Sequence, residues 1–341
     1  MTENIGLGLG LVLLGGVLQG SFALPLKRMP AWRWENTWLV YSFCGMIALP
    51  WVMVLATVPH FGEVLRGARG TTLAEVALFG LGWGVGSTLF GLGISRVGMA
   101  LSFAIVLGIT ASLGSLLPLL VLQPQQLFTP QGYALVAGLV LVILGIVLCS
   151  VAGRRREREL SVQPLRLGGT GFWLGLVICI LSGIFSAMLN FSFVFGKPLQ
   201  QLTLEAGAKP AMASNLVWAL ALSAGFLANG GYCAYLSQKN RSWAVLTQKD
   251  IPASYWLGAM LMGIVWFFGI AAYGMGAVDL GALGAVVGWP IFMAMNIITA
   301  NIWGAATGEW KGASSRTYGY SWAGIALLLI AIYVISRGST S

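Results

Sequence analysis

The chain has 341 residues, of which 57% are hydrophobic and only 9% are charged, and its mean hydropathy is +0.84. A soluble domain carries roughly 25% charged residues, so this composition excludes an ordinary globular protein and indicates a polytopic membrane protein. The formal net charge of +9 could suggest a nucleic-acid partner. No lysine-rich face or RNA-binding motif accompanies that charge, so we expect no nucleic acid to bind.

Apolar runs follow one another along the whole chain. A membrane-spanning helix needs about 20 mostly apolar residues. Runs of that length predict an all-α membrane fold with ten transmembrane helices, at 5–25, 35–58, 72–95, 98–122, 132–152, 170–195, 211–236, 254–276, 281–305 and 318–337. The first run has no basic segment before it and no small-residue cleavage site, so we expect a retained helix and not a signal peptide. The cysteines stand singly in or beside these runs, without metal or disulfide spacing, and we interpret them as small apolar residues: Cys44, Cys149, Cys179 and Cys233.

The longest polar segment, 154–167, divides the predicted helices into five and five. We therefore predict a first five-helix repeat over 1–158, a basic cytoplasmic loop over 159–168 and a second five-helix repeat over 169–341. An odd number of helices per repeat places the two repeats in the membrane with opposite orientations. Inverted repeats of this kind are typical of secondary transporters.

A duplicated stretch supports the division into two repeats. At a constant spacing of 183 residues, the segment 83–98 matches the segment 266–281. The matching pairs are Trp83 and Trp266, Gly86 and Gly269, Phe90 and Tyr273, Gly91 and Gly274, Gly93 and Gly276, and Gly98 and Gly281. Weaker matches relate 16–20 to 183–187 and 137–138 to 323–324. The 47 glycines are interpreted as helix-packing positions, because small residues let helices approach closely in lipid.

Basic residues are distributed unequally between the two sides of the membrane. The loops after the odd-numbered predicted helices hold 14 of the 19 lysines and arginines, including the cluster at 154–166. By the positive-inside rule those loops are cytoplasmic, so both termini are expected on the periplasmic side of a bacterial inner membrane.

Polar residues inside the predicted helices are the candidates for substrate binding, because each is unfavourable in lipid unless it has a partner. Ser182, Ser186 and Asn190 recur every four residues on one helix. Neutral hydrogen-bonding groups beside aromatic rings suit a sugar, whose hydroxyls pair with amides and whose ring stacks on an aromatic face. The proposed substrate-binding set is Gln19, Trp83, Ser87, Ser186, Asn190, Trp266, Tyr273, Trp289 and Asn296. The alternative is that the serines bond to their own backbone and the tryptophans belong to the interfacial belt.

The ten acidic residues offer no catalytic or metal-binding pair, and none lies at a helix centre. An enzyme would need a nucleophile, base or metal-ligand set, so the sequence predicts no enzyme and no cofactor. Three acids near the ends of predicted helices, Glu35, Asp279 and Glu309, are candidates for proton coupling. The alternative for each is a solvated helix cap or an ion pair, such as Glu309 with Lys311.

Several segments together resemble the L-rhamnose–proton symporter family of the drug/metabolite transporter superfamily. They are 32–38 (WRWENTW), 49–51 (LPW), 79–110, 183–187 (GIFSA) with Lys197-Pro198, and 308–311 (GEWK). The resemblance implies ten helices in two inverted repeats, a central sugar site and uptake driven by the proton gradient. By position it assigns importance to Trp34, Glu35, Trp38, Trp83, Gly108, Ser186, Lys197, Glu309 and Trp310.

These observations predict an inner-membrane secondary transporter that imports L-rhamnose or a related neutral or 6-deoxy monosaccharide with a proton, by alternating access. The expected partners are the sugar, the proton and the lipid bilayer, and the expected state is a monomer or weak homodimer. One alternative is an uncoupled sugar facilitator or small-metabolite exporter of the same fold. Others are a membrane enzyme acting on lipid-linked sugars and a sugar sensor.

Overall fold

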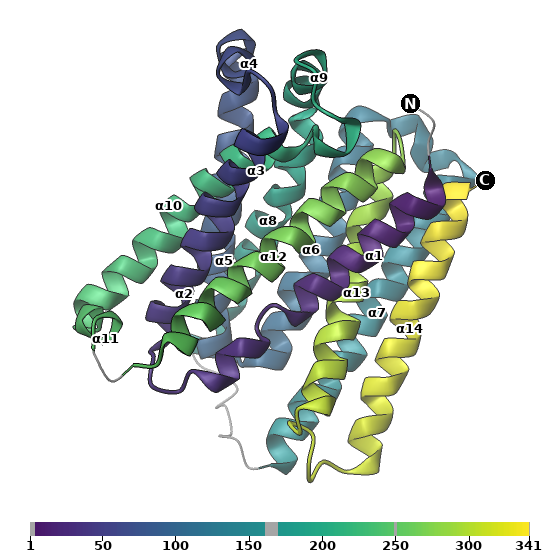
Figure 1. The fold of residues 1–341 in the computed structure, drawn as a ribbon. Coiled ribbons are helices and arrows are strands. Elements are labelled where there is room, and N and C mark those ends of the chain that lie inside the picture. The colour runs from purple at the N-terminus through teal and green to yellow at the C-terminus, as the bar shows by residue number, and fades with distance from the viewer. Residues whose placement is uncertain (1–3, 161–169, 249–250, 341) are drawn as a thin grey trace.

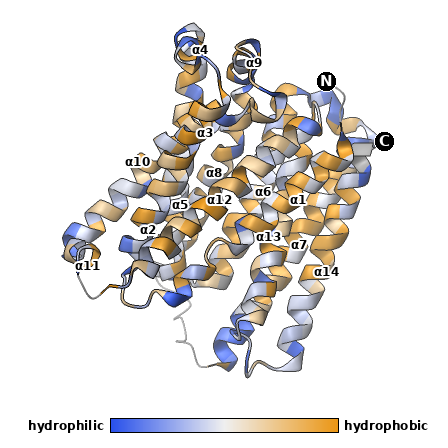
Figure 2. Ribbon diagram, viewed as in Figure 1, coloured by the Kyte–Doolittle hydropathy of each residue, from blue (hydrophilic) through white to orange (hydrophobic). Residues whose placement is uncertain are grey.

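The computed structural model describes residues 4–160, 170–248 and 251–340. Within them, ten helical segments are long and apolar enough to cross a membrane, as predicted. Nine are single helices: α1 (Ile5–Ser21), α5 (Gly70–Val97), α6 (Met99–Leu122), α7 (Pro130–Glu159), α8 (Thr170–Phe195), α10 (Asn215–Lys239), α12 (Ala253–Asp279), α13 (Gly284–Ala306) and α14 (Ser315–Thr340). Figure 2 shows apolar residues along these helices and hydrophilic residues gathered at the two ends of the bundle.

The remaining span is continuous but irregular. It consists of α2 (Trp34–Ser42), the π-helical segment η2 (Phe43–Ala48) and α3 (Leu49–Thr57). Pro50 lacks a backbone N–H, and its ring crowds the carbonyl one turn earlier, which disturbs the ordinary helical bonding. The N–H of Leu49 accordingly donates to the carbonyl of Cys44, five residues before it.

Short helices cap the bundle. They are η1 (Leu24–Arg28), α4 (Phe61–Gly67), η3 (Pro124–Phe128), α9 (Lys197–Glu205), η4 (Pro210–Met212) and α11 (Trp243–Leu246). Helices α4 and α9 stand at the end of the bundle where α1 begins and α14 ends, which we call the termini end (Figure 1). Helix α11 and the last residues of α7 lie at the opposite end, which we call the arginine-rich end.

The helix predicted at 132–152 is longer than expected. The start of the polar segment, residues 154–159, continues α7 as a helix through Glu159. The carboxylate of Glu159 accepts hydrogen bonds from the backbone N and Oγ of Ser314, at 2.7 and 2.8 Å, and from Thr317. These hydrogen bonds tie the last turn of α7 to the start of α14, outside the membrane. Residues 161–168 of the predicted loop lie outside the described residues.

Glycines set the close contacts between helices. Helix α5 packs on α8, and helix α1 packs on α12. A Cβ added to Gly86 would lie 2.7 Å from the backbone nitrogen of Ser186, and a Cβ on Gly15 would lie 2.7 Å from the carbonyl of Gly269. Such backbone approach is open only to glycine, which is how helices gain packing contacts in lipid.

The glycine contacts recur in matching pairs. A Cβ on Gly16 would lie 2.6 Å from Cβ of Met295, and a Cβ on Gly183 would lie 2.7 Å from Cβ of Ile109. Between α7 and α14 the contacts are reciprocal: Gly138 faces Ile335, and Gly324 faces Cys149. The spacing between Gly138 and Gly324 equals the spacing between Cys149 and Ile335, so the two helices present equivalent positions to each other.

Candidate functional site

Two tryptophans of the predicted set meet at the centre of the bundle. The rings of Trp83 on α5 and Trp266 on α12 stack with centroids 5.5 Å apart and planes inclined by 25°. The edge of Tyr41 approaches Trp266 at 6.0 Å. Trp83 and Trp266 lie at mid-length of their helices, so these two residues are not part of an interfacial belt.

Polar groups of the predicted set lie one turn from these rings. Ser87 accepts a hydrogen bond of 2.8 Å from the side-chain nitrogen of Asn229 on α10, and its single hydroxyl proton can go either to the side-chain oxygen of Asn229 or to the carbonyl of Gly84, both at 3.0 Å. Gln19 lies against Gly269, and its side-chain oxygen is buried and accepts no hydrogen bond from the described residues. A buried acceptor without a donor is unfavourable, so the Gln19 oxygen is suited to a bound hydroxyl or water.

A second group of predicted residues lies together nearer the termini end, and each of its side chains makes a hydrogen bond. The hydroxyl of Tyr273 donates to the side-chain oxygen of Asn190, whose nitrogen donates to the carbonyls of Gly114 and Ala285 at 2.8 and 3.2 Å. The indole nitrogen of Trp289 donates to the carbonyl of Thr110 at 3.0 Å. The rings of Tyr273 and Trp289 are 5.4 Å apart. We call Asn190, Tyr273 and Trp289 the central layer; all three are buried.

Ser186 and Asn296 lie at helix contacts. Ser186 is half-buried where α8 touches Gly86, and the neighbouring Ser182 donates to the carbonyl of Gly86 at 2.7 Å. Asn296 is half-buried on α13, and its carbonyl lies against Gly20 of α1. Both positions therefore lie at close contacts between the two halves of the chain, α5 on α8 and α1 on α13, and outside the central layer.

A cavity of about 440 Å³ opens at the arginine-rich end. Its deeper wall is apolar and includes Leu107 of α6 and Ile297 of α13, while Lys27, Arg156 and Glu309 lie at its mouth. We call it the inner cavity.

Glu309 joins three elements at the mouth of the inner cavity. Its carboxylate forms an ion pair with Lys27 and a second, at 2.9 Å, with Arg156. The Lys311 partner suggested by the sequence is therefore wrong, because the chain turns at Gly308 and directs the carboxylate back toward η1 and α7. Burial alone would raise the pKa of Glu309, but the hydrogen bond and charge of Lys27, followed by those of Arg156, outweigh it and lower the pKa.

Glu35 is placed differently. Its side chain is buried at the arginine-rich end of α2 and accepts hydrogen bonds of 2.9 Å from Asn240 and Ser242, which follow α10. The next residue, Asn36, donates to the carbonyl of Ser242 at 2.9 Å. Glu35 thus ties the end of α10 to α2, and it does not line the inner cavity.

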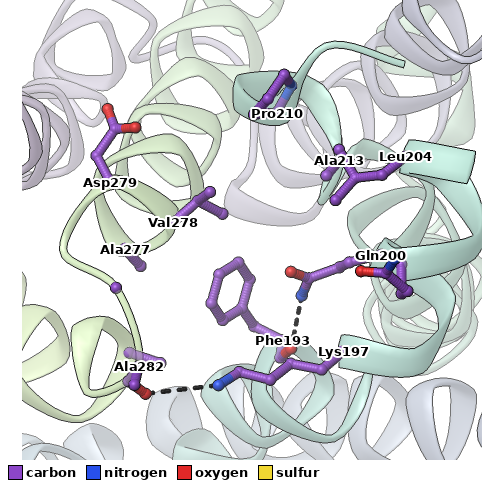
Figure 3. A pocket seen from close by; sticks show the side chains of 13 residues that line it. Phe193, Lys197, Gln200, Leu204, Pro210, Ala213, Ala277, Val278, Asp279 and Ala282 are labelled. Carbon is purple, nitrogen blue, oxygen red and sulfur yellow. Dashed lines mark hydrogen bonds between the residues drawn. The ribbon is translucent and has the colours of Figure 1, made fainter. Parts of the chain in front are cut away.

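A cavity of about 600 Å³ opens at the termini end, and we call it the outer cavity. Asp279 at the end of α12 and Lys197 at the start of α9 lie on opposite walls, as Figure 3 shows. The floor includes Phe193 and Ala285, the latter being the residue whose carbonyl accepts hydrogen bonds from the central layer.

The two cavities lie along α13, on either side of the central layer. Ala285 lines the outer cavity and Ile297 lines the inner cavity, while the buried Trp289 and Phe292 lie between them. A solute that crosses the bundle beside α13 must therefore pass the central layer.

Several residues of the candidate site were missed by the sequence analysis. They are Asn229 beside Ser87, Lys27 and Arg156 beside Glu309, and Phe193 and Gln200 in the outer cavity. Asn229 is a polar residue inside an apolar run, so the criterion that selected Asn190 would also have selected it. The others carry no local signal, because their role depends on contacts between distant segments.

The sequence pattern of the L-rhamnose-proton symport protein (RhaT) family matches residues 1–341, the whole chain. The chain belongs to this family. The family is a transport family, so the protein is a transporter and not an enzyme. With ten membrane-spanning segments and bacterial relatives, it is a multi-pass protein of the inner membrane.

Curated relatives cover the chain from end to end. Proteins named L-rhamnose-proton symporter from Klebsiella pneumoniae (strain 342) and Cronobacter sakazakii are each 26% identical, with 100% and 99% of both chains covered. The symporter of that name from an Escherichia coli strain is 24% identical, with 99% of both chains covered. A crystal structure matches 96% of this chain and 97% of its own, with a TM-score of 0.59 and 15% identity, a likeness that concerns the fold alone.

Proposed function

We propose that this member of the family takes up L-rhamnose or a related neutral or 6-deoxy monosaccharide together with a proton, by alternating access. The central layer carries the proposal, because it lies between two cavities and offers neutral hydrogen-bonding groups beside aromatic rings. Such groups suit the hydroxyls and apolar face of a sugar, and a buried network of this kind can exchange its internal bonds for bonds to a substrate. The names of the full-length relatives favour the same substrate and the same coupling ion.

The two halves, 1–158 and 169–341, are proposed to form inverted repeats that rock about the central layer and the Trp83–Trp266 pair. The matched glycine contacts support this arrangement: Gly16 packs on α13 in the same way as Gly183 packs on α6. The reciprocal contacts between α7 and α14 support it as well. Both sets of contacts are expected where a twofold axis relates the two halves of the chain.

The arginine-rich end is proposed to face the cytoplasm, with both termini periplasmic. The positive-inside rule supports this orientation, because the basic residues of α7 and of the segments around α11 lie at that end. In this orientation the sugar enters through the outer cavity and leaves through the inner cavity.

Glu309 is the proposed coupling site. It lines the inner cavity, and protonation would cancel the charge that holds both Lys27 of η1 and Arg156 of α7. When the two ion pairs form again, the positive charges of Lys27 and Arg156 stabilise the deprotonated carboxylate of Glu309. The proton is then released to the cytoplasmic side, in agreement with the lowered pKa of Glu309. Glu35 and Asp279 are weaker candidates, since Glu35 lies away from the inner cavity and Asp279 opens to the outer cavity.

Proteoliposomes test the proposal. L-rhamnose, L-fucose and related neutral sugars are supplied under an imposed pH gradient, and accumulation is compared with sugar–sugar counterflow. We expect accumulation of L-rhamnose only with the gradient, and we expect Glu309→Gln to retain counterflow but lose accumulation. Uptake that only equilibrates in the wild type would leave a facilitator of the same fold, and entry of none of these sugars would refute the substrate.

A further inference from the structure

The outer cavity is lined mainly by apolar residues, and separate elements contribute a few polar side chains to its walls. Lys197 begins α9, and Asp279 ends α12 on the other side of the space (Figure 3). Neither residue takes part in the ion pairs found within the described chain, which both belong to Glu309. Among the described residues, the ammonium of Lys197 makes one long contact, 3.5 Å, with the carbonyl of Ala282. A cation and an anion therefore line one cavity without forming an ion pair with each other.

A third polar group faces the same space. Gln200 donates its amide nitrogen to the carbonyl of Phe193 at 2.8 Å, and its amide oxygen is turned toward the cavity (Figure 3). The walls thus offer an ammonium donor, a carboxylate acceptor and an amide acceptor. The hydroxyls of a sugar both donate and accept, so they suit groups of all three kinds.

The floor of the outer cavity connects it to the central layer. The ring of Phe193 stacks on Trp218 at 5.3 Å and lies 5.8 Å from Tyr273. The indole nitrogen of Trp218 and the hydroxyl of Ser214 are buried, and neither has a hydrogen-bond partner among the described residues. Both lie against Gly274, where a Cβ would be 2.6 Å from the indole nitrogen and 2.9 Å from the hydroxyl. Buried polar groups left unpaired behind an aromatic floor are suited to a polar ligand that passes that floor.

We infer that the outer cavity is a first binding site for a neutral monosaccharide, which Lys197 and Asp279 bridge through its hydroxyls before it passes Phe193 toward Ser214, Trp218 and Tyr273. The inference rests on the proposed function and adds a site to it. The volume of the outer cavity lies within the range of about 300–1,000 Å³ that is usual for small-molecule sites. A sugar that bridges α9 and α12 also draws together the walls of the cavity, which would cover the bound molecule on its outer side.

Transport kinetics from each side of the membrane test this site. Membrane vesicles of defined orientation measure the KM for L-rhamnose offered at the termini end and, separately, at the arginine-rich end. We expect Lys197→Met and Asp279→Asn each to raise the KM at the termini end about tenfold or more, because each change removes a hydrogen bond to a charged group. The KM at the arginine-rich end stays within about twofold in both variants, which also shows that they are folded.

Matched controls remove a charge of the same kind at the same end. Lys209→Met and Glu63→Gln change residues that do not line the outer cavity, and we expect both to retain the wild-type KM. If the wild type transports L-rhamnose and both Lys197→Met and Asp279→Asn keep its KM, the first binding site is refuted while the proposed function stands. A wild type that neither transports L-rhamnose nor is thermally stabilised by it refutes both. If the protein bound lactate or alanine more tightly than rhamnose, the ligand would be a charged molecule and not a neutral sugar. That result would also overturn the inference.

Discussion

Trp83 and Trp266 occupy matching positions of the duplicated stretch, and their indole rings stack with centroids 5.5 Å apart. In the proposed inverted repeat, a residue can touch its own counterpart only at the twofold axis. In that proposed arrangement the pair marks the axis at mid-length of α5 and α12, where the substrate of an alternating-access transporter is expected to bind.

Removing this stacked pair tests its contribution to stability. We expect Trp83→Ala and Trp266→Ala each to lower the melting temperature, with a coupling free energy of about 0.5–1.5 kcal/mol between them because the two rings stack on each other. A double-mutant cycle, followed by thermal unfolding in detergent, measures this coupling free energy. Trp173→Ala is the control, since that side chain on α8 is 67% exposed and faces outward. Strict additivity of the two changes would mean that the stacking contributes nothing.

Two glycines of α5 test the close approach of the helices. In Gly86→Ala the new methyl group lies 2.7 Å from the nitrogen of Ser186, so α5 and α8 must separate, and we expect a loss of about 1–3 kcal/mol. In Gly91→Ala the methyl group meets no atom of the described residues within 4 Å, so we expect the change to be neutral or stabilising by up to about 1 kcal/mol. Melting temperatures of the two variants should therefore move apart. Equal effects would contradict the packing described for Gly86.

The central layer is tested by removing one oxygen atom. Tyr273→Phe leaves the buried side-chain oxygen of Asn190 without this donor, and we expect a destabilisation of about 1–3 kcal/mol together with a weaker apparent affinity for L-rhamnose. Thermal unfolding and uptake kinetics measure the two effects. Tyr133→Phe is the matched control, because that tyrosine is 61% exposed on α7. A Tyr273→Phe variant with normal stability and normal affinity would exclude the central layer from the path.

The Glu309 ion pairs predict a pH dependence with a definite sign. The pKa of Glu309 is lowered in the folded protein, so the stability gained from the pairs is present above the ordinary carboxyl pKa and is lost as the pH falls through the lowered one. We expect Glu309→Gln to remove that part of the acid dependence in thermal unfolding. The effect is small, because the Glu309 side chain is 40% exposed and solvent screens the pairs.

The lysines near Glu309 provide a matched comparison. Lys27→Met removes one of the ion pairs and is expected to impair accumulation, whereas Lys311→Met is expected to behave as the wild type. If Lys311→Met impaired accumulation and Lys27→Met did not, Glu309 would have Lys311 as its partner, as the sequence first suggested.

Glu35 is expected to act through structure. Glu35→Ala leaves Asn240 and Ser242 without their acceptor, so the segment after α10 should open and be cleaved faster by trypsin near Arg241. Glu35→Gln keeps an acceptor oxygen and should preserve both resistance to trypsin and accumulation of sugar. If Glu35→Gln instead keeps counterflow and loses accumulation, the coupling site belongs at Glu35.

The sequence alone determined the ten spans and the duplicated stretch, because hydropathy and spacing are local properties that each segment carries by itself. It also selected Asn190, Tyr273 and Trp289, since polar groups inside apolar runs need partners wherever they lie. Which groups become partners depends on the rotation of each helix and on the close contacts at glycines such as Gly86. Only the tertiary structure therefore decided that Trp83 stacks on Trp266, that Glu309 pairs with Lys27 and Arg156 rather than Lys311, and that Lys197 faces Asp279 across a cavity.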